Sequence, residues 1–308
     1  MPSVPPLTEP ILQWYEHAAR DLPWRAPGVG AWAVLVSEIM LQQTPVARVE
    51  PVYQAWLARW PTPTALAAEP AGEAVRMWGR LGYPRRALRL HACATAVRDR
   101  FAGQVPSDVA ALLELPGIGA YTARAIAAFA FGQRVPVVDT NVRRVVARAV
   151  GGQGAVGPPS TSRDLALVEA LLPESPRRAA RFSVGLMELG ALVCVARTPR
   201  CSACPIVDRC AWVRAGSPVY DGPTARPQGF AGTDRQVRGL LMEVLRRSAE
   251  PVAKAALDVV WQLPAQRERA LDSLVADGLI DPLPDGRYAL PGHAPSASAS
   301  ASAAAFPG

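Results

Sequence analysis

The sequence has almost no lysine. Its basic residues are nearly all arginine, and Lys254 is the only lysine in 308 residues. A mechanism that needs a lysine amine, such as Schiff-base formation, is therefore excluded within residues 1–253. No run approaches the ~18 apolar residues of a membrane-spanning helix, and the amino terminus has no basic stretch followed by an apolar one. These absences predict a soluble, cytoplasmic protein without a membrane partner.

Acidic residues are outnumbered by basic ones. The chain carries 33 Arg and Lys side chains against 26 Asp and Glu, which gives a net charge of +7 and an isoelectric point near 9.6. An excess of positive charge favours a polyanionic partner, of which nucleic acid is one class. Half of the residues are hydrophobic, which is enough for two domains with their own cores and a small third one.

Cysteine is scarce, and four of the five cysteines stand close together. Cys194, Cys201, Cys204 and Cys210 are separated by six, two and five residues. Thiols crowded in this way bind a soft metal or form disulfides, and disulfide frameworks are typical of small exported proteins. Zinc modules usually present two knuckles farther apart, so four ligands from one short loop favour an iron-sulfur cluster. The spacing predicts a metal centre and leaves the identity of the metal open.

The chain divides into four parts by composition. Runs of helical period, broken by Pro and Gly, fill residues 8 to about 213 and predict an all-α core. A Pro- and Gly-rich linker is expected at 214–233, and a low-complexity, disordered tail at 291–308. Residues 234–290 resemble a winged helix, with helices expected at 234–248, 252–261 and 265–277 and a hairpin around Asp285.

A single carboxylate interrupts the apolar run AWAVLVSEIML. Glu38 is the only charged residue between Arg25 and Arg48, and the run is apolar enough to form a buried helix. Burial disfavours the charged form of a carboxylate and raises its pKa, as a general acid near neutral pH requires. The alternative is a Glu that points into solvent, the common position of a helical Glu. The absence of any other charge on this helix favours burial.

A second carboxylate, Asp139, stands in VPVVDTNVRRVVARAV, where an extended apolar run meets a new helix. An Asp at such a junction caps the helix, and this role alone would explain the residue. The positive end of the helix is also expected to keep the pKa of Asp139 low. One protonated and one ionised carboxyl group suit the cleavage of a glycosidic bond through an oxocarbenium-like transition state.

The segment LELPGIGAYTARAIAAFAFG lies between these carboxylates in the sequence. Its LPGIG run predicts a tight turn that opens an Ala-rich helix, the pattern of a helix-hairpin-helix motif. Glycine lets backbone amides approach a phosphate oxygen, and the start of the helix adds positive charge. Such a turn binds DNA without reading its sequence. The alternative is a plain turn between two helices.

Five motifs occur in the order SEIMLQQT, LGYPRRALRLH, LPGIGAYTARA, VVDTNVRRV and MELGALVC, and the cysteine loop follows the last of them. In this order they resemble the MutY family of adenine DNA glycosylases, within the endonuclease III superfamily, over residues 8–213. The resemblance implies hydrolysis of the N-glycosidic bond of adenine mispaired with 8-oxoguanine or guanine. The expected partner is double-stranded DNA with such a mispair, and a monomer at the bacterial nucleoid is expected.

The resemblance also implies roles for individual residues. Glu38 matches the acid that protonates adenine, and Asp139 matches the carboxylate that stabilises the sugar cation, with Tyr121 and Asn141 in support. The four clustered cysteines match the ligands of a [4Fe-4S] cluster. DNA and base contacts are implied at Arg25, Gln42, Gln43, Thr44, Leu81, Gly82, Tyr83, Leu115, Gly117, Ile118 and Gly119.

The implied fold is a helix-hairpin-helix glycosylase with an iron-sulfur subdomain at 8–28 and 137–213 and a six-helix barrel at 29–136. Bifunctional relatives have a lysine where this chain has Tyr121, so a monofunctional glycosylase is expected. Two features depart from the family. Pro84 replaces a second tyrosine, and residues 234–290 are too short for the Nudix-like domain that reads 8-oxoguanine. Short C-terminal regions of this type resemble those of actinobacterial members.

Two other functions fit parts of the pattern. A thymine glycosylase acting on T opposite G would share the fold, the cluster and Asp139, although Glu38 within SEIMLQQT favours adenine. An iron-sulfur DNA-binding regulator would use the winged-helix-like domain as its reader. That function leaves Glu38 and Asp139 unexplained, and it predicts that no base is released from DNA.

Overall fold

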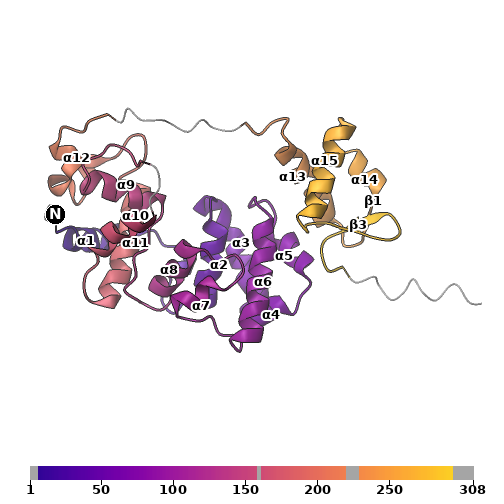
Figure 1. The fold of residues 1–308 in the computed structure, drawn as a ribbon, viewed down its shortest axis with the longest axis horizontal. Helices are drawn as coiled ribbons and strands as arrows, with labels where there is room; N and C mark the ends of the chain where they lie inside the picture. The colour runs from indigo at the N-terminus through magenta and orange to yellow at the C-terminus, as the bar shows by residue number, and fades with distance from the viewer. Residues whose placement is uncertain (1–5, 158–160, 220–228, 294–308) are drawn as a thin grey trace, which may run out of the picture. The chain divides into compact units, whose positions relative to one another are not determined.

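The computed structural model describes residues 6–157, 161–219 and 229–293 (Figure 1). The chain forms two compact units, one from Met1–Gln42 with Gln104–Arg226 and the other from Gln43–Gly103 with Pro227–Gly308. The predicted linker lies outside the described residues at 220–228, and the predicted tail does so at 294–308. The subdomain boundaries implied by the resemblance divide the chain at other positions and stay a prediction.

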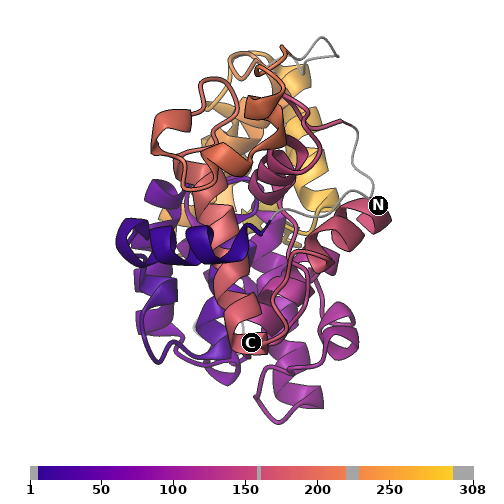
Figure 2. The same ribbon diagram turned by 90° about the vertical axis from the view of Figure 1, so that its left-hand side faces the viewer.

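The first unit is helical throughout its described residues, as expected for this part of an all-α core. Its elements are α1 (Thr8–Ala18), η1 (Pro23–Arg25), α2 (Ala31–Leu41), α7 (Val109–Leu113), α8 (Ala120–Phe129), α9 (Thr140–Ala149), α10 (Thr161–Glu169), α11 (Pro176–Leu192), η2 (Cys201–Ala203), η3 (Val207–Arg209) and α12 (Ala211–Arg214). The long helix α11 contacts α1, α8 and α9, and Figure 2 shows α1 lying across it. Helix α2 packs on α8.

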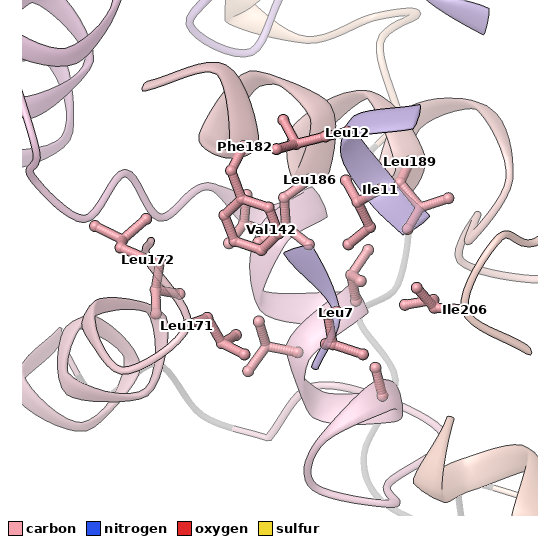
Figure 3. Close-up of a cluster of buried hydrophobic side chains, with 14 of the residues drawn as sticks. Leu7, Ile11, Leu12, Val142, Leu171, Leu172, Phe182, Leu186, Leu189 and Ile206 are labelled. Carbon is pink, nitrogen blue, oxygen red and sulfur yellow. The ribbon is translucent and has the colours of Figure 1, made fainter. Parts of the chain in front are cut away.

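One hydrophobic core joins α1, α9 and α11 of the first unit (Figure 3). The fully buried side chains include Ile11 from α1, Val142 from α9, and Phe182 and Leu186 from α11. Burial of each large apolar side chain stabilises the fold by about 1.5–3 kcal/mol. The same core contains Ile206 and Cys210, so it continues beneath the cysteine loop. The loop is therefore attached to the packed interior of this unit.

The second unit combines a helical segment with a small C-terminal segment of mixed structure. Its elements are α3 (Val46–Arg59), α4 (Pro63–Ala67), α5 (Ala71–Trp78), α6 (Arg85–Arg100), α13 (Asp234–Arg247), β1 (Val252–Ala253), α14 (Lys254–Asp258), α15 (Pro264–Ala276), β2 (Asp281–Pro282) and β3 (Arg287–Ala289). Helix α6 packs on α4 and α5. Trp56 meets Trp60 and Trp78 edge-to-face, at ring-centroid distances of 4.7 and 5.9 Å, and all three indoles are buried.

The C-terminal strands form a three-stranded antiparallel sheet in the order β1-β3-β2. The predicted hairpin around Asp285 is confirmed as β2 and β3. The helix predicted at 252–261 is wrong at both ends, because Val252 and Ala253 form β1 and α14 ends at Asp258. Val252 pairs with Tyr288 across the sheet, and this tertiary pairing overrides the helical pattern of the local sequence.

No described helix has the length and apolar character needed to cross a membrane.

Candidate active site and cysteine loop

Glu38 lies on the buried face of α2, where its predicted burial is confirmed. The residue is 6% exposed, and Val34, Leu35 and Ile39 around it are buried as well. Burial raises the pKa of Glu38 from an ordinary 4.5 to about 7, although a hydrogen bond with Tyr121 and the charge of Arg25 oppose the rise. The negative charge of Asp139 raises the pKa further. The carboxyl group is therefore able to exchange a proton near neutral pH.

Asp139 caps helix α9, as predicted. Its Oδ1 accepts a hydrogen bond from the Val142 amide at 2.7 Å, and its Oδ2 accepts one from Asn141 Nδ2 at 2.8 Å. The expected lowering of its pKa is wrong in direction, because burial raises the pKa of Asp139. The hydrogen bonds from Val142 and Asn141 and the charge of Arg144 oppose this rise.

Four residues predicted for catalysis occur together in the first unit. Tyr121, on α8, interacts electrostatically with both Glu38 and Asp139, and burial together with these two charges raises the pKa of its hydroxyl well above 10. The phenol therefore stays protonated and donates its hydrogen bond to Glu38. Asn141 contacts Asp139 directly. The structure brings the acid, the carboxylate and their two supporting polar groups into one cluster.

A buried ion pair adjoins this cluster and was not predicted. Glu188, on α11, is fully buried and accepts hydrogen bonds from Arg20 Nε at 2.7 Å and Arg25 Nη2 at 3.0 Å. Burial would raise the pKa of Glu188, but the hydrogen bonds from both arginines lower it to about 2. Nη1 of Arg25 is buried and has no hydrogen-bond partner among the described residues. Glu188 is the only charged residue between Arg181 and Arg197, so a search for a lone charge in an apolar run would have identified it as it did Glu38.

Arginine 144 connects the Asp139 cap to the cysteine loop, and it too was not predicted. Its Nη2 donates to Asn141 Oδ1 at 2.7 Å and to the Gly190 carbonyl at 2.6 Å. Its Nε donates to the Cys194 carbonyl at 2.6 Å. Helices α9 and α11 approach closely here, because a Cβ added at Gly190 would lie 2.7 Å from Asn141 Cβ. Only glycine fits position 190 without displacing one of the helices.

The four clustered cysteines line one pocket in the first unit. The other lining side chains are mainly apolar and include Val145, Leu189 and Trp212. Arg148, from α9, donates to Cys194 Sγ at 3.3 Å and also to the carbonyls of Val195 and Ala196. The loop that carries the thiols is thus fixed to α9 by hydrogen bonds and to the core by packing.

All five cysteines are free thiols, so the disulfide alternative finds no support. Burial raises the pKa of Cys204 to about 11, which keeps this thiol protonated unless a cation is nearby. No three His, Cys, Asp or Glu side chains of the described ranges are placed to hold a single metal ion. A four-iron cluster is larger than one ion and holds its thiolate ligands farther apart. The four thiols nevertheless share one pocket, and a set of four cysteines is the ligand set of such a cluster.

The turn of the expected helix-hairpin-helix motif joins α7 to α8. Leu115 and Ile118 are buried and anchor the turn, whereas Gly117 and Gly119 are exposed. Gly117 has φ of +81°, a conformation that disfavours other residues, and Gly119 is the N-cap of α8. The turn thus presents backbone to solvent at the positive end of a helix. Gln42, at the end of α2, donates to Thr122 Oγ1 of α8 at 3.3 Å.

The other predicted DNA contacts belong to the second unit, where they form a separate cluster. Gln43 and Tyr83 are exposed, with φ of +54° and +47°, values that non-glycine residues rarely adopt. Thr44 and Leu81 are buried, and Thr44 Oγ1 donates to the Leu81 carbonyl at 3.3 Å.

Arg86 holds this second cluster together and was not predicted. It is buried, and its Nη2 donates to Thr44 Oγ1 at 2.9 Å and to the Gly82 carbonyl at 3.0 Å. Its guanidinium also lies over the rings of Trp78 and Tyr83, 5.1 and 5.6 Å from their centroids. Burial lowers the pKa of Arg86 to about 10, so the side chain stays charged at neutral pH.

Comparison with known proteins places these features in one family. Residues 36–169 match the model of the HhH-GPD superfamily base excision DNA repair protein. The chain is 60% identical to the adenine DNA glycosylase of Mycolicibacterium smegmatis, over 92% of this chain and 95% of that protein. A solved thermostable thymine-DNA glycosylase is 28% identical and has a TM-score of 0.61, over 68% of this chain and 95% of its own.

An endonuclease III–DNA complex has a TM-score of 0.58 at 23% identity, over 68% of this chain and 94% of that one, and this likeness shows the fold alone. The fold is therefore the helical, endonuclease III-like fold that the sequence predicted. The mycobacterial relative is similar over nearly its whole length. The chain accordingly belongs to the MutY-type adenine DNA glycosylases of the HhH-GPD superfamily, enzymes that act on N-glycosyl bonds.

Proposed function

We propose that the protein removes adenine mispaired with 8-oxoguanine or guanine from duplex DNA and leaves the DNA strand intact. One observation carries this proposal: burial raises the pKa of the Glu38 carboxyl group to about 7, and the nearby negative charge of Asp139 contributes to this rise. Two carboxyl groups with different proton affinities are what hydrolysis of a glycosidic bond requires.

Glu38 acts as the general acid. Its proton passes to the adenine ring, the bond between the base and C1′ of the sugar breaks, and the bonding electrons leave with the base. Protonation makes adenine a neutral leaving group, and general acid catalysis of this kind contributes about 10²–10⁴-fold in rate. Water then adds to C1′, and its proton restores the acid form of Glu38. Tyr121 holds the carboxyl group in place through its hydrogen bond.

Asp139 stabilises the positive charge that develops on the sugar. Its two oxygens are fixed by Val142 and Asn141, so the carboxylate needs no reorientation when the cation forms. The buried, unpaired Nη1 of Arg25 fits a contact with an acceptor on the extruded base, the role implied by the family resemblance. Glu188 neutralises Arg25 and fixes its direction.

Adenine inside a duplex is out of reach for these groups, so it must be turned out of the stack into the site. We assign the contact with the opened mispair to Gln43 and Tyr83 of the second unit, whose exposed side chains are presented on strained backbone. These two residues are held by the buried Thr44, which donates a hydrogen bond to the Leu81 carbonyl and accepts one from Arg86. The exposed turn at Gly117 and Gly119 is assigned to the DNA backbone.

Strand cleavage through a Schiff base is absent from this mechanism. Tyr121 occupies the position where bifunctional relatives have their lysine, and Lys254 of α14 forms salt bridges with Asp258 and Glu268. A phenol with a raised pKa does not form an imine with the sugar aldehyde. The enzyme is therefore monofunctional, and nicks appear only after heat or alkali.

Cys194, Cys201, Cys204 and Cys210 are proposed to hold a [4Fe-4S] cluster in their shared pocket. Four cysteine ligands would leave no open coordination position, so a bound cluster would stabilise the exposed loop that carries Arg197, Arg200 and Arg209 and would take no part in base release. Purified protein should be brown, and Cys201→Ser should lower its folding yield and DNA affinity more than base release from bound DNA.

Residues 234–290 are proposed to form a winged-helix-like domain, since three helices are followed by a hairpin as expected. The additional strand β1, between α13 and α14, pairs with this hairpin to complete a three-stranded sheet. The boundaries of the iron-sulfur and six-helix-barrel subdomains, given above from the family resemblance, belong to this proposal as well. So do a monomeric state and a location at the bacterial nucleoid, where the DNA substrate lies.

Three duplexes test the proposed activity, with A opposite 8-oxoguanine, A opposite guanine, and T opposite guanine. We expect base release from the first two, detected as alkali-dependent cleavage, and Glu38→Gln should lower the rate at least about 100-fold. Release of thymine instead would favour the alternative related to the thymine-DNA glycosylase. Unchanged activity of a folded Glu38→Gln variant would contradict the mechanism, strand nicks without alkali would refute monofunctionality, and no base release would favour the regulator.

A further inference from the structure

The C-terminal segment, residues 229–293, has no excess of positive charge. It carries eight Arg and Lys side chains and nine Asp and Glu, whereas residues 6–219 carry 24 and 16. Six of its eight basic side chains form salt bridges inside the segment, namely Arg238, Arg247, Lys254, Arg267, Arg269 and Arg287. Proteins bind DNA nonspecifically through basic side chains that replace its counterions. This segment offers few such side chains, including on α15, its candidate recognition helix.

Within the second unit, the C-terminal segment and helix α5 instead cap one another. The backbone amide of Gly72, in the first turn of α5, has no acceptor within its own helix. It donates instead to the Pro291 carbonyl of the C-terminal segment at 2.7 Å. The last carbonyls of α13 likewise have no donor within their own helix. Nη1 of Arg76, from α5, donates to the carbonyls of Leu245, Arg246 and Ser248. A cation at this helix end is also favoured by the helix dipole. Each element thus satisfies the free backbone groups of the other.

The contact is tight as well as polar. A Cβ added at Gly72 would lie 2.7 Å from the Pro291 carbonyl oxygen and 2.9 Å from Leu290 Cβ. Arg246 Nε donates to the Val75 carbonyl at 3.1 Å, and burial lowers the pKa of this arginine to about 10. A close approach of backbone to backbone, with a buried arginine beside it, is typical of a fixed interface.

Helix α5 ends at Trp78, directly before the loop at residues 79–84, which carries the exposed Tyr83. Trp78, the last residue of α5, is buried and donates from Nε1 to the Gly82 carbonyl at 3.0 Å. Two further arginines reach the C-terminal segment: Arg80, within the loop, pairs with Glu243, and Arg85, directly after it, pairs with Asp277. These two pairs are exposed and contribute little on their own. The buried contacts of Gly72 and Arg76 dominate the attachment.

We propose that the C-terminal segment fixes the position of the loop at residues 79–84 and does not itself bind DNA. By fixing α5, it holds Tyr83 in the conformation that contacts the opened mispair. The inference rests on the proposed function of Tyr83. It assigns the discrimination between 8-oxoguanine and guanine in part to Gly72 and Arg76, which lie outside the loop itself.

Four variants of the full-length protein test this proposal. Gly72→Ala places a Cβ against Pro291, although alanine is the better helix former and does not weaken α5 itself. Arg76→Ala removes the cap of α13. Gly239→Ala, at a helical glycine with open space around it, is the control for the first variant. Arg269→Ala, on the exposed face of α15, is the control for the second and also tests direct DNA binding.

The main measurement is the ratio of single-turnover rates of adenine release opposite 8-oxoguanine and opposite guanine, with active protein determined by titration. A loss of stability alone lowers both rates equally and leaves the ratio unchanged. We expect Gly72→Ala and Arg76→Ala to lower the ratio about fivefold, the effect of one lost hydrogen bond. The two controls should leave the ratio unchanged, and Arg269→Ala should leave DNA affinity unchanged.

Hydrogen exchange of residues 79–84 without DNA gives a second measurement that needs no catalysis. Gly72→Ala and Arg76→Ala should speed exchange in this loop, and the controls should not. Failure of the wild type to release adenine would refute the proposed function. The exchange data would still show whether the contact between the C-terminal segment and α5 fixes the loop. Unchanged exchange, an unchanged ratio, or a tenfold loss of DNA affinity in Arg269→Ala would each overturn the inference.

Discussion

At the scale of single residues, burial assigns the chemical roles. Glu38 and Asp139 are both partly or fully removed from water, yet only Asp139 accepts two strong hydrogen bonds from fixed donors. Burial raises the pKa of both groups, and the hydrogen bonds limit the rise at Asp139. The two hydrogen bonds favour the ionised form of Asp139, whereas burial of Glu38 favours its acid form.

The first prediction concerns the pH dependence of activity. Because the acid form of Glu38 is required and its pKa is about 7, kcat/KM should be highest below pH 7 and fall at higher pH. The expected fall is about tenfold for each unit above the pKa. Steady-state assays from pH 5.5 to 9 measure it, with Glu38→Gln as a control that lacks this dependence. A rate that stays level up to pH 9 would contradict the assignment of the acid.

The same shift makes folding stability depend on pH. The folded state binds the Glu38 proton more tightly than the unfolded state, so its contribution is complete below pH 4.5 and is lost as pH rises through about 7. The total loss is about 3 kcal/mol. Glu38→Gln should therefore melt at a higher temperature than the wild type at pH 8, and show little difference at pH 4.5.

A second prediction concerns the buried ion pair of Glu188. Glu188→Gln leaves Arg20 and Arg25 without their shared counterion and should lower stability by about 3–5 kcal/mol. Denaturant unfolding at neutral pH measures this loss. Glu16→Gln is the matched control, because its pair with Arg181 is exposed and should contribute less than about 1 kcal/mol. Equal effects of the two changes would show that burial of Glu188 does not matter.

Much of the residue-level chemistry could be predicted from sequence. The lone charge in an apolar helix identified Glu38, and the spacing of the thiols identified the cysteine loop. Arg86 and Arg144 could not be found in this way, since each is one of many arginines and becomes distinct only through its contacts. The direction of the pKa shift of Asp139 was wrong, because the sequence shows a helix cap but not how deeply it is buried.

At the scale of elements, the site depends on how closely α9 and α11 approach. Gly190 of α11 faces Asn141 of α9, and Arg144 joins both helices to the cysteine loop. Since Asn141 donates a hydrogen bond to Asp139, the spacing of the two helices determines the position of the oxygen that we propose stabilises the sugar cation. The existence of these helices was predictable from their apolar period. Their contact was not, because a glycine in a helix gives no indication of which neighbour it faces.

A third prediction tests this contact. Gly190→Ala should force α9 away from α11 and lower stability by about 1–3 kcal/mol, as overpacking does, although alanine favours helix. Adenine release should fall by about tenfold or more, because Asp139 loses its position. Urea unfolding and single-turnover rates measure the two effects. Gly239→Ala, at a site with open space for a Cβ, should lower neither the stability nor the rate of adenine release. Retention of full activity in Gly190→Ala would contradict the proposed dependence on helix spacing.

At the scale of the whole molecule, charge is distributed unequally along the chain. The excess of basic over acidic side chains lies in residues 6–219, and residues 229–293 are slightly acidic. This division can be counted in the sequence, and the net charge of +7 alone conceals it. The pairing of the basic side chains within the C-terminal segment could not be predicted, because its salt bridges join residues far apart in sequence. The strand at Val252 was missed for the same reason, since its partner Tyr288 is remote.

A fourth prediction follows from this distribution. The dependence of DNA affinity on salt reports the number of phosphates neutralised by the protein. Arg197→Ala, in the exposed cysteine loop, should lower the slope of log Kd against log salt by about one. Arg269→Ala should not change it, because that arginine is already neutralised by Asp234. Fluorescence anisotropy with a labelled duplex at several salt concentrations measures both slopes.

The left-handed backbone at Gln43 and Tyr83 has an evolutionary consequence. Holding a non-glycine residue in this conformation costs about 1–3 kcal/mol, so glycine at either position would make the protein harder to melt. It would also remove the side chain proposed to enter the DNA. Selection for heat resistance alone would therefore favour variants that lack the proposed DNA contacts, so the retention of Gln43 and Tyr83 would reflect selection for that contact and not for stability.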